Sequence, residues 1–416
     1  MKKIFFLWLL FTNITFLSQA QTLEDYFVVA AENNPKLKAD YKAFEMALQK
    51  TTQVNALPDP NLSLGYFLSP IETRVGAQQF RAELSQMFPW FGTLSARRNV
   101  AALEAEAIYQ KFLDAKNQLY YEVSVAYFDL YEIQKLREIE RQNINILDSY
   151  KNVATIKFEN AQGSMVDVLR VELMLKEATT SLNILEKKEM PLRSKFVQLL
   201  NIDADSLKKT GIALDSTVFQ KIYSFTDIAL QKDSLLVNNP VLEALEYKLQ
   251  SSQAKEELAQ KEGLPKLGVG VAYVATAKRT DMEVMDNGKD AVMPMISMSL
   301  PIYRKKYKAA QRKAQLEQEM IQFQKENKTN QLLTTYDKIW FQLQRQQELI
   351  TLYQAQKTDT EHIIKLLYAA YTNIGTDFEE VLRMQKELLM YQKKIIIAQK
   401  NYQTAIAELN YLTHKR

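Results

Sequence analysis

Three acidic side chains, Asp377, Glu379 and Glu380, lie within four consecutive positions of the chain. Closely spaced carboxylates can act as a general acid and base or contribute to a metal site, but both uses need a pocket and partner groups. Acids are also common in the first turn of a helix, where they complement its dipole. If several copies of the chain meet around one axis, the same acids form a charged ring. Two interpretations of the three acids therefore remain open: the ordinary first turn of a helix, and a ring that provides selectivity or gating. Catalysis is the least favoured interpretation.

Two possible hydrogen-bond donors flank this acidic segment. Arg383 follows Asp377 by six positions and Glu380 by three, and Tyr371 precedes the segment. Donors at these spacings can hold like charges together across a narrow opening. The tripeptide Val-Leu-Arg follows Asp377 at 381–383, and it also occurs directly after Asp167, at 168–170. Asp167 is therefore the alternative position for such a ring.

The remaining chemistry is sparse. The chain has no cysteine and only two histidines, His362 and His414, which are too far apart in sequence to suggest a coordination site. Methionine thioethers bind soft cuprous ions, and five methionines gather in one region, although methionine is also common apolar filler. They are Met282, Met285, Met293, Met295 and Met298. Without a phosphate loop, a nucleophile triad or a zinc motif, we expect no enzyme, no cofactor and no resident metal site.

Proline and glycine, which interrupt helices and strands, are few, and their positions indicate where helices begin and where the chain turns. Pro89 and Pro301 precede stretches of about 70 residues that are rich in helix-forming side chains. At the ends of these stretches, Gly163 and Gly375 are the candidate turns between helices. At 1.5 Å per residue such helices are roughly 100 Å long, which no single globular core requires.

The chain repeats itself at an offset of 213 residues, where LEAEAI at 103–108 matches LEQEMI at 316–321 and Val168-Leu169-Arg170 matches Val381-Leu382-Arg383. Asn33-Asn34-Pro35 also recurs, as Asn238-Asn239-Pro240. We therefore predict two equivalent halves. The predicted divisions are a signal peptide at 1–20, a first repeat at 21–201, a linker at 202–232 and a second repeat at 233–416.

Each half is predicted to contain a helix, two strands, a long helix, a turn and a final helix. The predicted ranges are 22–56, 61–69, 79–88, 92–161 and 165–201 in the first half, and 233–262, 266–276, 291–300, 304–374 and 377–414 in the second. Apolar positions in the long helices alternate in steps of 4 and 3, which indicates a coiled-coil seam. These positions are Leu119, Val123, Ala126, Leu130 and Ile133, and then Leu332, Tyr336, Ile339 and Leu343.

The N-terminus indicates export. Lys2 and Lys3 precede an apolar run that ends in Ser18-Gln19-Ala20, the pattern of a cleaved secretory signal peptide. The net charge of +4 is nearly balanced and predicts no nucleic-acid partner. The densest basic segment, at 304–313, is interpreted as a solvated helix start, with contact to anionic lipid headgroups as the alternative.

The four predicted strands alternate between apolar side chains and small or polar ones, as a membrane β-barrel requires. Phe67, Phe80, Phe88, Trp90 and Phe91 could form an aromatic girdle. An ordinary soluble sheet over the helices is the alternative. Four strands cannot close on themselves, and open edges in hydrocarbon cost several kcal/mol for each unpaired backbone group. The membrane interpretation therefore predicts assembly, and three copies would supply a barrel of about twelve strands.

The repeated NNP, the hairpin ending in proline, the long helix and the glycine turn followed by an acid and Val-Leu resemble the TolC-like outer-membrane efflux proteins over the whole mature chain. The segments Ala56-Leu57-Pro58-Asp59-Pro60 and Met87-Phe88-Pro89-Trp90-Phe91-Gly92 are most similar to the heavy-metal branch, which handles cations and copper. The resemblance implies a mainly α fold of long antiparallel coiled-coil helices. It also implies four strands per protomer that contribute to a trimeric 12-stranded membrane β-barrel above an α-helical tunnel.

The resemblance further implies a location in the outer membrane, with the tunnel in the periplasm. The implied partners are two further copies in a homotrimer, a periplasmic adaptor (membrane fusion) protein, an inner-membrane resistance-nodulation-division (RND) pump and outer-membrane lipid. It implies a periplasmic aperture formed by Tyr371, Asp377, Glu379, Glu380, Arg383 and Asp167 at the helical tips. Drug efflux or type I protein secretion by the same fold is one alternative, and a soluble periplasmic coiled-coil scaffold is another.

Overall fold

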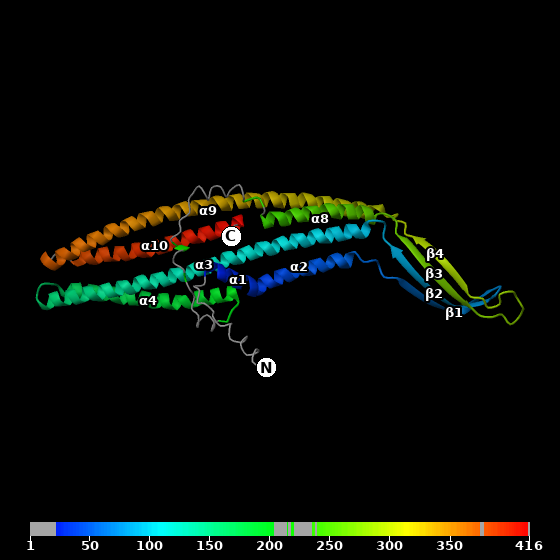
Figure 1. Cartoon of the computed structure of the whole chain (residues 1–416), viewed down its shortest axis with the longest axis horizontal. Helices are drawn as coiled ribbons and strands as arrows, with labels where there is room; N and C mark the ends of the chain where they lie inside the picture. The colour runs from blue at the N-terminus through cyan, green and yellow to red at the C-terminus, as the bar shows by residue number, and fades with distance from the viewer. Residues whose placement is uncertain are drawn as a thin grey trace, which may run out of the picture. The chain divides into compact units, whose positions relative to one another are not determined.

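The computed structural model describes residues 22–203, 214, 218–219, 235–237, 239–374 and 378–414. Long helices and one four-stranded antiparallel sheet make up this part of the chain (Figure 1), which confirms the predicted mainly α fold class. The first elements are α1 (Leu23–Asn33), α2 (Pro35–Val54), β1 (Asn61–Thr73), β2 (Gly76–Phe88), α3 (Thr93–Glu159) and α4 (Met165–Leu200). Next come α8 (Pro240–Glu262), β3 (Leu267–Thr276), β4 (Ala291–Met298), α9 (Arg304–Ile374) and α10 (Phe378–Thr413). The predicted signal peptide and most of the predicted linker lie outside the described residues.

The chain forms two compact units, and each draws on both sequence repeats. Unit 1 comprises Met1–Lys38, Ala115–Val237 and Leu332–Arg416, and unit 2 comprises Ala39–Asp114 and Asn238–Gln331. Unit 1 therefore contains the turns that follow α3 and α9, and unit 2 contains the sheet.

The sheet in unit 2 has the strand order β1-β2-β3-β4, with every neighbouring pair antiparallel. The two hairpins meet through β2 and β3, where Leu84 lies opposite Val271. The outer strands β1 and β4 each contain a proline, Pro70 and Pro294. Pro70 falls where the β1–β2 register shifts, which fits a residue that has no N–H to donate. Edge strands tolerate proline in this way, whereas central strands rarely do.

The helices of unit 2 pack closely because α8 carries small side chains. Ser251 and Ser252 are buried, and the Ser252 hydroxyl donates to the Ala314 carbonyl of α9 at 2.9 Å. Three ion pairs in series also join four helices. Glu104 of α3 pairs with Lys50 of α2 at 2.9 Å and with Lys255 of α8 at 3.1 Å. Lys255 in turn pairs with Glu317 of α9 at 3.1 Å. Burial opposes the ionised form of Glu104, but hydrogen bonds from Lys50 and Lys255 lower its pKa overall.

Unit 1 contains the predicted coiled-coil seam. All nine seam positions are buried, from Leu119 to Ile133 and from Leu332 to Leu343, which confirms the predicted pattern. An aromatic cluster closes the core beside it, where Tyr26 of α1 packs edge-on against Phe196 of α4 with ring centroids 5.0 Å apart. The α1–α2 junction also meets the end of α4, because Asn34 Nδ2 donates to the Leu199 carbonyl at 3.0 Å.

Two predicted helix boundaries were wrong, and one residue type explains both. The predicted helix 22–56 is two helices, α1 and α2, divided at Asn34, and the helix predicted from 233 begins at Pro240. Asn34 Oδ1 accepts from the Leu37 amide at 3.1 Å, and Asn239 Oδ1 accepts from the Val241 amide at 3.0 Å. An asparagine cap followed by proline at the first helical position starts a new helix.

The repeated caps generate a prediction. Asn34→Ala should cost about 1 kcal/mol of local stability at the start of α2, so amide exchange at Leu37 should accelerate roughly fivefold at that cost. Asn239→Ala should do the same at Leu242 of α8. Hydrogen exchange resolved to single residues measures both, and Asn55→Ala, at a position after α2 ends, is the control. Unchanged exchange at Leu37 in Asn34→Ala would show that the cap does not hold this turn.

Candidate functional site: helical tips and open sheet

The α3–α4 turn in unit 1 is fixed by backbone hydrogen bonds at the end of α3. Gln162 N donates to the Lys157 carbonyl at 2.8 Å, and Ala161 N donates to the Phe158 carbonyl at 3.0 Å, the pattern of a Schellman motif. The left-handed position belongs to Ala161, with φ of 54°, and not to the predicted turn residue Gly163. Gly163 instead lets the backbone pass close to Lys157, since a Cβ at position 163 would lie 3.0 Å from the Lys157 Cβ.

Lys157 joins this turn to the end of α9. Its Nζ donates to the Tyr371 carbonyl at 2.7 Å and lies 4.5 Å from the centroid of the Tyr371 ring. The last carbonyls of a helix lack intrahelical partners and carry the negative end of its dipole. The ammonium group of α3 therefore caps α9, and this contact links the two tips within one protomer.

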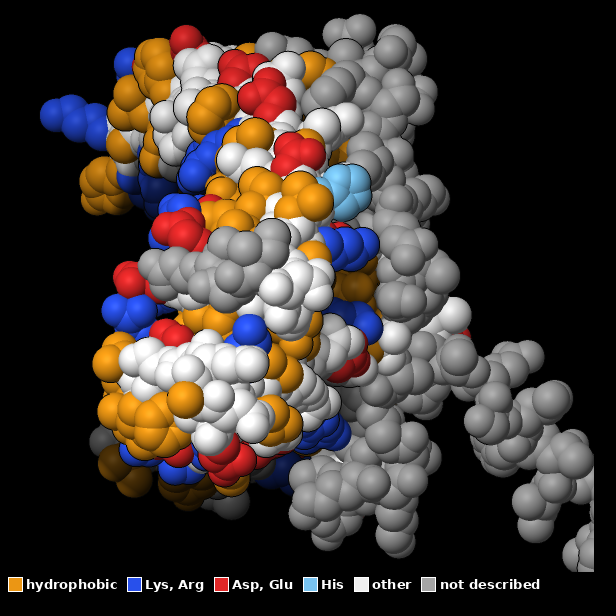
Figure 2. Space-filling model, turned by 90° about the vertical axis from the view of Figure 1, so that its left-hand side faces the viewer, with side chains coloured by type: hydrophobic (Ala, Val, Ile, Leu, Met, Phe, Trp, Pro, Cys, Tyr) orange, Lys and Arg blue, Asp and Glu red, His pale blue; other side chains and the backbone are white. Residues whose placement is uncertain are grey.

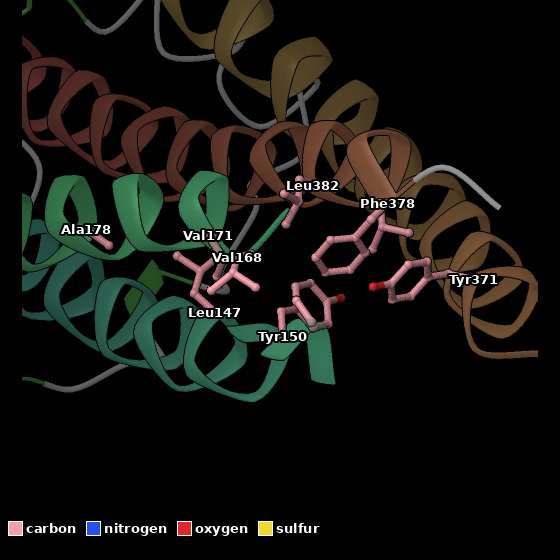
Figure 3. Packing of buried hydrophobic residues seen from close by; sticks show 10 residues of the cluster. Leu147, Tyr150, Val168, Val171, Ala178, Tyr371, Phe378 and Leu382 are labelled. Atoms are coloured by element: carbon pink, nitrogen blue, oxygen red, sulfur yellow. The ribbon is translucent and has the colours of Figure 1, made fainter. Parts of the chain in front are cut away.

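Aromatic side chains fill the space between the tips (Figure 3). The Phe378 ring at the start of α10 stacks on Tyr371 with centroids 4.3 Å apart and meets Tyr150 of α3 edge-on at 5.8 Å. Val168 and Leu382, from the two copies of the Val-Leu-Arg repeat, belong to the same buried cluster. Burial raises the pKa of Tyr150 to about 12, with Tyr368 adding to the effect. Burial also raises the pKa of Tyr371, and the charge of Asp167 contributes.

The predicted aperture residues are brought to these tips, with contacts that differ among them. Glu379 pairs with Arg170 of α4 at 2.8 Å, so α4 and α10 are linked across the tip. Arg383 bonds to Glu380 one turn earlier on α10, and Glu387 lies 3.8 Å from it one turn later. Gly375 and Asp377 lie outside the described residues. Surface pairs such as these contribute below about 1 kcal/mol each, so the aromatic cluster contributes more to tip stability.

The surface around the α3–α4 turn mixes apolar and charged groups. Seen end-on, hydrophobic side chains alternate with basic and acidic ones on this end of unit 1 (Figure 2). The exposed apolar side chains at the turn are Ile156, Phe158, Met165, Val166, Leu169 and Leu173. No single sign of charge dominates this surface.

The sheet of unit 2 is unusual because its apolar face is exposed. Cross-strand register places one set of side chains on the same face, and among them Leu64 is 65% exposed and Ile296 86% exposed. The set comprises Leu62, Leu64, Tyr66, Phe80, Ala82, Leu84, Gln86, Phe88, Leu267, Val269, Val271, Tyr273, Ala275, Val292, Pro294, Ile296 and Met298, in which Gln86 is the one residue with an amide side chain. We call it the apolar sheet face. A soluble protein rarely leaves so continuous an apolar surface uncovered.

The opposite sheet face carries small, polar and thioether groups. It includes Ser63, Gly65, Arg81, Glu83, Ser85, Met87, Gly268, Gly270, Ala272, Met293, Met295 and Ser297. Met87 and Ser297 both lie over Gly268, where a Cβ would come within 2.5 Å of the Met87 sulfur. Of the five methionines singled out from the sequence, Met293 and Met295 therefore share this face, and Met298 belongs to the apolar sheet face.

The described residues lack two features that bear on function. These residues contain no group of three or more histidine or acidic side chains that could hold a metal ion. Their helices also contain no stretch that is long and apolar enough to cross a membrane.

Two residues that matter at the tips were not predicted from the sequence. Lys157 gave no motif signal, although a basic residue in the last turn of a helix is a known capping preference. Ala161 could not have been identified, because alanine seldom adopts positive φ and the nearby Gly163 was the better candidate.

The sequence of the second half and the fold of the chain are similar to those of known proteins. Residues 232–413 match the family model described as outer membrane efflux protein. This match covers most of the second half of the chain, which is similar in sequence to that family. The sequence has no match among curated proteins.

Solved structures share the fold over almost the whole chain. The outer-membrane channel OprN is 16% identical with a TM-score of 0.73, covering 94% of this chain and 89% of its own. The outer membrane protein VceC from Vibrio cholerae is 13% identical with a TM-score of 0.74, covering 94% and 95%. CusC, described in terms of folding and transmembrane channel formation, is 13% identical with a TM-score of 0.72, covering 94% and 91%. At these identities the comparison shows a shared fold, that of outer-membrane channels.

Proposed function

We propose that the protein is the outer-membrane channel subunit of a tripartite efflux system and conducts its substrate passively from the periplasm to the exterior. The observation that carries the proposal is the exposed apolar sheet face together with two open edge strands. Strands β1 and β2 have 13 residues each and β3 has 10, enough to cross a bilayer when tilted. The family match of the second half and the shared channel fold support the same function.

The open edges define the assembly that we propose. Unpaired backbone groups at β1 and β4 would cost several kcal/mol each in hydrocarbon, so β1 of one copy pairs with β4 of the next. Three copies with four strands each close a barrel of 12 strands. The apolar sheet face then meets outer-membrane lipid, and the face with Ser63 and the glycines lines the interior. A periplasmic adaptor and an inner-membrane RND pump deliver the substrate to this homotrimer.

Disulfide cross-linking between introduced cysteines tests this assembly. The sequence contains no native cysteine, so only the introduced thiols can react. The double variant Ser63→Cys/Ser297→Cys places one thiol on each edge strand. Mild oxidation in membranes should give a ladder on denaturing gels that ends at the trimer. The register between β1 of one copy and β4 of the next is set only on assembly, so the residue of β1 that lies opposite Ser297 is not fixed in advance. Neighbouring pairs such as Gly65→Cys/Ser297→Cys are therefore tested in parallel. The single variants are the controls and should stay monomeric; cross-links in the singles, or none in any double, would contradict the head-to-tail closure.

We propose that the helical tips form the periplasmic aperture of the tunnel. Tyr371, Lys157 and Phe378 tie the α9–α10 turn to α3, which favours a closed state maintained within each protomer. Asp167, Glu379 and Glu380, together with Asp377, are the candidates for a ring of carboxylates that favours cations. Arg383 contacts acids of its own helix, so its part in closing the aperture would depend on reaching a neighbouring copy.

The aperture proposal predicts which variants open the channel. Lys157→Met removes the cap on α9 and should raise single-channel conductance in planar bilayers at least about twofold, and Tyr371→Leu should act in the same direction. Lys151→Met is the matched control, since Lys151 pairs with Glu172 of α4 at 2.9 Å and not with α9. Glu379→Gln/Glu380→Gln should lower cation selectivity. Parental conductance in Lys157→Met would place the constriction elsewhere.

We propose heavy-metal cations as the cargo, with drug efflux or protein secretion as the alternatives. The supporting observations are the sequence resemblance to the heavy-metal branch and the thioethers of Met87, Met293 and Met295 on the proposed interior face. Thioethers suit soft monovalent ions such as Cu⁺ and Ag⁺.

Gene deletion tests the cargo. Cells without the protein should become more sensitive to copper, silver, zinc or cobalt than to large hydrophobic drugs. Complementation with Met87→Leu/Met293→Leu/Met295→Leu should restore tolerance to zinc fully and to copper and silver only partly. A strain sensitised to drugs and not to metals would favour the multidrug alternative.

A further inference from the structure

Where the sheet of unit 2 meets its helices, exposed apolar and aromatic side chains gather on two short connections. Phe91 follows β2, and Leu300, Ile302 and Tyr303 follow β4; Ile302 is 70% exposed and Tyr303 76%. Trp90 packs edge-on against Phe91 with centroids 6.0 Å apart. Aromatic and apolar groups in such a position are typical of the boundary between hydrocarbon and headgroups.

Basic side chains follow this boundary at once. Between Asp290 and Glu317 the sequence contains six basic residues and no acidic one. They are Arg304, Lys305, Lys306, Lys308, Arg312 and Lys313. The other connection has the same character, since Arg97 and Arg98 are the charged residues between Glu83 and Glu104.

Several of these cations have no carboxylate partner in the described part of the chain. Arg304 Nη1 donates to the Gly263 carbonyl at 3.1 Å, and Lys306 lies 4.7 Å from the centroid of the Tyr307 ring. Lys305 and Lys308 are exposed, and no described carboxylate lies within ion-pair distance of either. Lys266, at the start of β3, is also exposed and joins this edge through a 2.9 Å hydrogen bond from Ser299 N to its carbonyl.

The dimensions fit a layer of lipid headgroups. Arg304 to Lys308 spans about 6 Å along α9 at 1.5 Å per residue, and the headgroup layer of one leaflet is roughly 5–8 Å thick. Arg304, Lys305 and Lys308 lie within about 100° of one another around the helix axis at 100° per residue. Their charges therefore share one face at the depth where phosphates would be.

We infer that Lys266, Lys305 and Lys308 form a binding surface for anionic phospholipid headgroups at the periplasmic edge of the sheet. The inference rests on the proposed function, which places the apolar sheet face in the bilayer. It adds a lipid partner of defined charge to that function: uncompensated ammonium groups beside an apolar boundary complement phosphate lipids with net negative charge.

Trp90 provides a probe at this edge. In a Trp340→Phe background, Trp90 is the tryptophan that remains after export, and its fluorescence is measured in vesicles that contain brominated phosphatidylglycerol or brominated phosphatidylcholine. Each basic group near an anionic surface corresponds to roughly a fivefold effect on binding, so the parent should prefer phosphatidylglycerol by at least that factor. Lys266→Gln/Lys305→Gln/Lys308→Gln should reduce the preference to near unity. The charge-matched control, Lys187→Gln/Lys188→Gln/Lys195→Gln on α4, should keep it.

The outcomes separate the two proposals. Equal quenching by both lipids in the parent, or equal loss of preference in both triple variants, overturns the headgroup surface while the membrane location of the sheet stands. If neither brominated lipid quenches Trp90, that location is overturned, and with it the proposed channel.

Discussion

The backbone groups at the edges of the sheet impose the main physical constraint on this protein. Strands β1 and β4 have no neighbour on their outer sides within the described chain, and the sheet exposes a continuous apolar face. In water such a sheet would aggregate, and in lipid its open edges would be unpaired. The proposed closure with further copies would satisfy both requirements at once. The prolines of the edge strands are compatible with this arrangement if their ring nitrogens fall where no ladder bond is needed.

The long helices meet a different physical requirement, which is stability without a large core. Very long helices have little core of their own, and their stability depends on side-by-side packing along a seam. The seam of unit 1 provides this packing, and the ion chain from Lys50 through Glu104 and Lys255 to Glu317 ties four helices of unit 2. At the tips, where helix dipoles and unpaired carbonyls accumulate, Lys157 donates to the Tyr371 carbonyl, and the rings of Tyr150, Phe378 and Tyr371 pack the helix ends together.

These features connect the two surfaces to a single function. A sheet that is apolar on one side and small or polar on the other separates lipid from water, and long helices that end in compact, capped turns can extend a passage and restrict it. In the proposed function, this arrangement also accounts for the few recognisable chemical motifs in the sequence. A passive conduit needs matched surfaces and stable closures, and neither requires a nucleophile or a general base.

Local pattern alone determined most of the elements, because breakers, period-two strands and the 4-3 apolar seam act over short distances. It also singled out Asn34 and Asn239 as part of a repeat, but not as caps that divide helices. What only the tertiary structure decided was how distant segments meet. The pairing of β2 with β3, Lys157 on the end of α9, and Arg170 with Glu379 all depend on contacts between elements far apart in sequence. Such contacts leave no periodic trace in the sequence, since the two side-chain contacts each need one residue at one position and strand pairing uses backbone groups that every residue carries.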